Sequence, residues 1–163
     1  MANLRSIAVV LSAMCIIAGF FVTSRSDAAV PPNGSSAAAH PTPGKPHFSD
    51  YRGVSIGMTA DAVRQKLGAP KEPGNEQDMY AFSEFECAQF YYDAAHNVTA
   101  IMITYSGDLK AAPTALQVLG EDVPPRPDGG VSKMVRYPKE GFWISYNRGG
   151  EADAVVSVAI QKI

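Results

Sequence analysis

Within residues 48–163, the sequence signals for a helix followed by three strands occur twice in the same order, and this repetition constrains the fold most. A helix is expected to begin after Thr59 and another after Thr114, because threonine hydroxyls accept hydrogen bonds from free N–H groups at helix starts. Gly68 and Gly120 are expected to end these helices. Each helix is followed by three strand-like segments: 79–83, 86–93 and 98–105, then 131–137, 141–147 and 154–162.

This order predicts an α+β domain built from two helix-plus-three-strand repeats. Three-stranded meanders that follow one another combine into one antiparallel sheet, and the two helices then cover a single face of it. The domain is expected over 48–163, with the repeats at about 48–107 and 108–163. The alternative is that two amphipathic strand sets look alike by chance, but the element order and spacing agree as well as the pattern.

The N-terminal residues 1–28 have the pattern of an export signal. Arg5 provides a weak positive flank, the run 7–22 is apolar, and Ser26 to Ala28 presents small residues at the positions that a signal peptidase reads. The alternative is an uncleaved anchor, because a run of this length can just cross a thinned bilayer. We therefore expect an exported protein, periplasmic or secreted, with any membrane attachment made by residues 7–22.

The segment 29–47 is rich in proline, alanine and serine and predicts a flexible linker. It has almost no large apolar side chain, so burial cannot offset its chain entropy. Cys15 belongs to the apolar run, where Ser12-Ala13-Met14 precedes it in place of the triplet typical of lipid attachment. Cleavage leaves Cys87 as the only cysteine, so packing and not a disulfide is expected to stabilise the domain.

A short motif opens the domain and resembles a known family. The residues Tyr51-Arg52-Gly53-Val54-Ser55-Ile56-Gly57-Met58-Thr59, followed by Val63, Leu67-Gly68 and Pro70, resemble the entry motif of SmpA/OmlA-type outer-membrane lipoproteins. The duplicated form resembles β-lactamase-inhibitor-like proteins. Both resemblances imply an exported, non-catalytic domain that presents a sheet surface to another protein, and the motif residues themselves have structural roles.

The sequence offers no organised catalytic, metal or nucleic-acid site. His40 and His47 lie in the linker and His96 in an expected turn, so no dyad with a nucleophile can be proposed from spacing. The domain contains no short-spaced Cys or His pair, and its basic residues are scattered among acids in a chain of net charge −2. We therefore expect no enzyme activity, no cofactor, no metal and no nucleic-acid partner.

Alternation along the strands predicts which residues a partner would meet. If Phe90, Tyr92, Ile144 and Tyr146 face the helices, their neighbours face the opposite, open side of the sheet. The predicted partner-binding residues are Gln89, Tyr91, Arg136, Trp143, Ser145 and Ser157. The alternative is that Trp143 packs beneath the loop 120–130, because large aromatic side chains are usually mostly buried and one bulge would exchange the faces.

The expected function is protein binding in the cell envelope or outside the cell, as an assembly accessory or an inhibitor-like partner. The alternative is a protein that binds a small ligand or a cell-wall fragment, with Trp143 and Tyr91 stacking on a ring.

Overall fold

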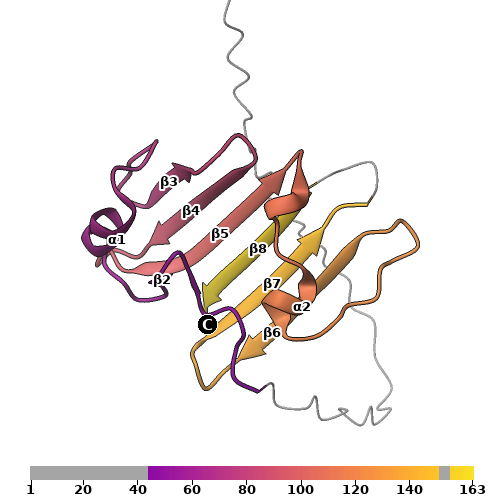
Figure 1. Ribbon diagram of the computed structural model, residues 1–163. Helices are drawn as coiled ribbons and strands as arrows, with labels where there is room; N and C mark the ends of the chain where they lie inside the picture. Colours follow the sequence, from indigo (N-terminus) through magenta and orange to yellow (C-terminus); the bar gives the residue numbers. More distant parts are fainter. Residues whose placement is uncertain (1–43, 151–154) are drawn as a thin grey trace, which may run out of the picture. The chain divides into compact units, whose positions relative to one another are not determined.

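The computed structural model describes residues 44–150 and 155–163. The predicted signal segment and residues 29–43 of the predicted linker lie outside this range. Two short strands come first and are followed by two similar series of elements (Figure 1). The elements are β1 (Asp50–Tyr51), β2 (Val54–Ser55), α1 (Ala60–Leu67), β3 (Gln77–Ala81), β4 (Glu86–Tyr92), β5 (Val98–Ser106), the 3-10 helix η1 (Leu109–Ala111), α2 (Ala115–Leu119), β6 (Val131–Tyr137), β7 (Phe142–Arg148) and β8 (Val155–Lys162).

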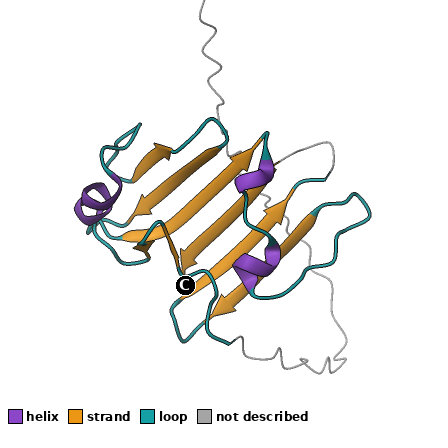
Figure 2. Ribbon diagram, in the orientation of Figure 1, coloured by secondary structure: helices purple, strands orange, loops and turns teal. Residues whose placement is uncertain are grey.

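The strands β3 to β8 form one six-stranded sheet in the order β3-β4-β5-β8-β7-β6 (Figure 2). Every neighbouring pair is antiparallel. The expected α+β class and the single antiparallel sheet are therefore confirmed. The last strands of the two series, β5 and β8, lie next to each other at the centre, and β3 and β6 form the edges.

The caps of both helices use the residues that the sequence indicated. The Thr59 side chain accepts a hydrogen bond from the Ala62 N–H, and Thr114 forms a capping box with Gln117. Gly120 ends α2 in the left-handed conformation at φ 77°, which glycine adopts without the steric cost that a Cβ brings. The His47 ring lies directly against Gly120 and occupies the space that a Cβ would need.

Both helices contact the sheet face that carries the core: α2 lies over it, and α1 lies beside β3 and β4 (Figure 2). Arg64 on α1 contacts Asp78, which lies beside Phe90 on this face. Figure 1 shows α2 in front of β7, and its Val118 and Leu119 are buried. The central strands contribute the largest fully buried apolar side chains of the sheet: Phe90, Val98, Ile101, Ile103, Ile144, Val156, Val158 and Ile160. Burial of such side chains is the main favourable term in folding.

The structure differs from the expected elements most at β3 and in its first small sheet, and the short helix η1 was not expected. β3 begins at Gln77, two residues before the expected start. The expected start was too late because the polar pair Gln77-Asp78 has the composition of a loop. The two-stranded sheet of β1 and β2 was not expected, since two-residue strands are too short to show alternation. This small sheet brings Tyr51 to β4, where its hydroxyl donates a hydrogen bond to Glu86 Oε1 at 2.6 Å.

One bulge interrupts the alternation, and it lies in the first series. Tyr91 is paired with Ala100 and Tyr92 with Val98, so Thr99 is an extra residue in β5. The bulge turns Val98 into the core, where it is fully buried. β7 pairs with both neighbours in continuous register, so the alternation predicted for Trp143 is not disturbed.

Candidate partner-binding face

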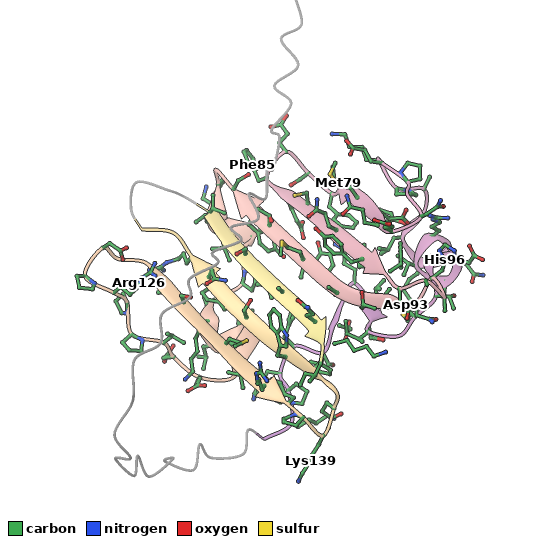
Figure 3. All side chains as sticks on the ribbon, turned by 180° about the vertical axis from the view of Figure 1, so that it is seen from behind. Met79, Phe85, Asp93, His96, Arg126 and Lys139 are labelled. Carbon is green, nitrogen blue, oxygen red and sulfur yellow. The ribbon has the colours of Figure 1, made fainter. Side chains whose placement is uncertain are left out.

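The sheet face opposite the helices carries three rows of side chains across its four central strands. The register of β4, β5, β8 and β7 sets the rows. They are Cys87-Thr104-Ser157-Asn147, Gln89-Met102-Ala159-Ser145 and Tyr91-Ala100-Gln161-Trp143. We call these twelve residues the open face. Figure 3 views the sheet from behind, and no described helix crosses the strands on this side.

None of the twelve residues of the open face carries a formal charge. At the 18% content of charged residues in the chain, about two of twelve positions would be charged. The charged residues labelled in Figure 3, Asp93, Arg126 and Lys139, lie around the margin of the sheet. Charge depletion at the centre, together with Tyr, Trp and Met, is typical of the core of a protein interface.

The structure places all six predicted binding residues on this side of the sheet. Gln89, Tyr91, Trp143, Ser145 and Ser157 are half-buried members of the open face. Arg136 lies on the edge strand β6, directly opposite Trp143 in the register, and is exposed. The neighbours of Trp143 in β7, Phe142 and Ile144, are buried on the other side. The alternation argument therefore assigned the faces of β4 and β7 as the structure has them.

The structure does not bring Tyr91 and Trp143 into contact. They share a row, but Ala100 and Gln161 lie between them. Three steps between strands of about 4.8 Å each separate their backbones by about 14 Å. A single sugar or aromatic ring cannot stack on both side chains at once, so the geometry does not favour the small-ligand alternative.

The loop 120–130 does not cover Trp143. Its Val123 and Pro125 line a cavity together with Tyr146 and Val156, which lie on the helix side of the sheet. The alternative in which Trp143 packs beneath this loop is therefore wrong. Prolines 124 and 125 keep the loop extended over the helix side, and that arrangement depends on tertiary contacts that alternation does not reveal.

The open face carries hydrogen-bonding groups for a partner. The Tyr91 hydroxyl donates a hydrogen bond to Gln89 Oε1 at 2.9 Å, which orients both side chains along β4. Within residues 44–150 and 155–163, the Trp143 indole N–H and the Ser145 and Ser157 hydroxyls have no hydrogen-bond partner. A partner could therefore accept hydrogen bonds from the open face without breaking internal ones.

The predicted binding residues include five of the twelve residues of the open face. The predicted set lacks Met102, Ala100 and Ala159, because these residues join it only through the pairing of β5 with β8. The edge strands extend the face with Met79 on β3 and Met134 on β6, and Met134 is 51% exposed. The signal that could have found them is the register between the two series of strands.

The helix side holds a buried carboxylate with a structural role. Asp78 is fully buried and accepts hydrogen bonds from Arg64 Nε at 2.8 Å, from the Gly74 N–H at 3.1 Å and from the Tyr92 hydroxyl at 2.9 Å. Burial alone would raise the pKa of Asp78, but these donors outweigh it and hold the pKa below its usual range. The network joins α1, the loop before β3, and β4.

A second carboxylate joins the two-stranded sheet to β4. Glu86 accepts hydrogen bonds from the Tyr51 hydroxyl and from Arg52, whose guanidinium also lies 4.0 Å from the centre of the Phe82 ring. Burial would raise the pKa of Glu86, but the Tyr51 and Arg52 hydrogen bonds lower it below its usual value. Since their hydrogen bonds connect structural elements, we assign both carboxylates to stability.

The described residues contain no candidate metal-binding cluster, and their histidines lie apart from each other. No cluster of three or more His, Cys, Asp or Glu among them could hold a metal ion. His47 lies against Gly120, and His96 occupies the turn between β4 and β5 with φ 58°. No helix in the described ranges has the length and apolar character to cross a membrane, and the apolar run 7–22 lies outside those ranges.

The fold and the open face define a class: an α+β domain with helices on one side of an antiparallel sheet and an uncharged centre on the opposite side. Comparisons with protein-family models, curated proteins and solved structures found no match to the chain. The resemblance to SmpA/OmlA-type lipoproteins and β-lactamase-inhibitor-like proteins therefore stays a prediction.

Proposed function

We propose that this domain is a non-catalytic module that binds another protein through the open face. The uncharged open face is the observation that supports the proposal. Covering it does not require a charge to be removed from water, which costs several kcal/mol per unpaired ion. Tyr91, Met102 and Trp143 supply the apolar and aromatic surface that dominates binding energy at interfaces.

The size of the face indicates what such a partner must contact. Six strands about 4.8 Å apart span about 24 Å, and seven residues of strand extend about 23 Å. The open face together with the edge strands β3 and β6 therefore covers about 550 Å², below the roughly 800 Å² that each partner buries in a standard interface. A stable partner would also contact the loops around the sheet, and a partner limited to the sheet would bind transiently.

We also propose that the module acts outside the cytoplasm. The support is the sequence pattern of residues 1–28, with its apolar run and small residues at the expected cleavage site. Periplasmic and secreted locations are both consistent with this pattern. An assembly accessory of the envelope and an inhibitor-like partner of an exported enzyme would both use such a surface.

The finer form of the fold proposal is a tandem repeat. Its support is the order α1-β3-β4-β5 followed by α2-β6-β7-β8, with the third strands of both units paired at the centre. The N-cap residues of the two helices are 55 positions apart, and the glycines that end the helices are 52 positions apart. The helix α2 has three residues fewer than α1. A single shortened helix therefore accounts for the change in spacing.

The substitution Ser145→Arg tests the proposed binding surface. Ser145 lies in the middle row, and an arginine there would place an uncompensated charge under any protein that covers the face. We expect capture of a discrete protein from envelope extracts to be lost with Ser145→Arg and kept with Ser49→Arg, an exposed serine outside the face. Equal capture by both variants, with unchanged melting temperatures, would exclude the open face as the binding surface.

A further inference from the structure

A cavity of about 410 Å³ lies on the helix side of the sheet, away from the open face. Its walls come from the η1–α2 segment, the loop 120–130, and β6, β7 and β8. Figure 1 shows η1 and α2 in front of the strands β8 and β7 in this region. Leu109, Val123 and Val156 are among its apolar walls, and its volume is in the range of small-molecule sites in proteins.

The buried Tyr146 hydroxyl lacks a protein partner. Tyr146 lines the cavity and is 3% exposed, yet its hydroxyl makes no hydrogen bond to any residue of 44–150 and 155–163. Each fully enclosed side-chain N or O atom of those residues has a partner, so the hydroxyl keeps its remaining access through the cavity. The buried hydroxyls of Tyr80 and Tyr92, by contrast, donate to Gly68 and Asp78. The Tyr146 hydroxyl therefore reaches the space of the cavity with its donor unused by the protein, so it is available to a bound molecule.

Arg148 supplies a positive charge beside this hydroxyl. It follows Tyr146 by two residues in β7, so both side chains point to the same side of the sheet, and both line the cavity. One Arg148 nitrogen donates a hydrogen bond to the Gly129 carbonyl at 3.2 Å, which orients the guanidinium and leaves its other donors available. Burial raises the pKa of the Tyr146 hydroxyl and the Arg148 charge opposes that rise, as expected for neighbouring groups.

We propose that this cavity binds a small monocarboxylic acid with an apolar body, its carboxylate held by the Tyr146 hydroxyl and the Arg148 guanidinium. A tyrosine hydroxyl and an arginine together form charge-assisted hydrogen bonds to carboxylate oxygens. Asp122 also lines the cavity, and its charge disfavours a second negative charge on the ligand, so a phosphate dianion fits less well. The apolar walls receive the body of the acid.

The test is an NMR titration of the ¹⁵N-labelled full chain with 4-phenylbutyrate and with the neutral alcohol 4-phenylbutan-1-ol. We expect 4-phenylbutyrate to shift the amide signals of cavity residues such as Leu109, Val123 and Val156. The alcohol should bind at least about tenfold more weakly, because it lacks the charge that Arg148 recognises. No shift at the cavity at about 10 mM 4-phenylbutyrate, or equal affinity for both compounds, would overturn the proposal.

Three variants separate the roles of the two polar groups. Tyr146→Phe removes only the hydroxyl and should weaken 4-phenylbutyrate binding about tenfold without lowering the melting temperature. Arg148→Met should remove the preference for the acid over the alcohol, and the control Arg126→Met changes an exposed arginine that does not line the cavity. Wild-type affinity in folded Tyr146→Phe would contradict the assignment. Because the cavity and the open face lie on opposite sides, protein capture should be unchanged in Tyr146→Phe, so the two proposals fail separately.

Discussion

Removing the Asp78 carboxylate should destabilise the domain strongly. In Asp78→Ala the Tyr92 hydroxyl and the Gly74 N–H lose their acceptor, and Arg64 loses both hydrogen bonds to the carboxylate. Arg64 is 38% exposed and can regain water, so its loss is small. The buried Tyr92 hydroxyl left without a partner costs about 1–3 kcal/mol, the part-buried Gly74 N–H costs less, and the lost packing adds to this. We therefore expect Asp78→Ala to lower the free energy of unfolding by about 3–4 kcal/mol.

Urea unfolding followed by Trp143 fluorescence and by far-UV circular dichroism measures this loss. With a slope of about 1.5 kcal/mol per molar urea, the midpoint should fall by about 2 M at unchanged slope. The control Asp122→Ala removes an exposed carboxylate that makes no hydrogen bond or ion pair within the described ranges, and its midpoint should stay within about 0.3 M of wild type. If the midpoint of Asp78→Ala fell by less than about 0.5 M, the buried network would not have the role argued from its geometry.

Two further predictions concern acid stability and the end of α2. In the folded state the pKa values of Asp78 and Glu86 lie below their ordinary values of 3.8 and 4.5, so the folded state binds fewer protons than the unfolded state. The stabilisation by these two carboxylates is complete above the ordinary pKa values, and it is lost as the pH falls through the lowered pKa values of the folded state. The urea midpoint should therefore fall between about pH 6 and about pH 3, and a constant midpoint would contradict the assigned pKa directions. Gly120→Ala forces a Cβ into the left-handed conformation and against the His47 ring, so it should lower the free energy of unfolding by about 1–2 kcal/mol. Gly44→Ala, which meets no neighbour, should be neutral, and equal stability of the two variants in urea would refute this reading.

The sequence predicted those parts of the fold that depend on local chemistry and alternation. The caps Thr59 and Thr114, the ends Gly68 and Gly120, and the order of strands follow from side-chain hydrogen bonds, glycine conformation and period-two burial. Alternation also assigned Trp143 to the open side, and the assignment holds because β7 contains no bulge. These features are each set within a few residues of the chain.

Features that depend on contacts between distant segments could not be predicted in the same way. Asp78 was not expected in a strand, because a charged side chain in the core needs a partner, and its partner Arg64 lies in a helix 14 positions earlier. Met102 and Ala159 joined the open face only through the pairing of β5 with β8. The cavity around Tyr146 exists because the loop 120–130 lies over the helix side, and its course is set by tertiary packing.

The central claim is that the open face contacts a protein partner, and site-specific photo-cross-linking in the producing cells tests it most directly. A photoreactive residue would replace Ser145 at the centre of the face, and in a second variant Ser49, which is exposed outside it. We predict a discrete cross-linked protein from position 145 and none from position 49. The same product from both positions, or none from position 145 in a correctly folded variant, would contradict the account.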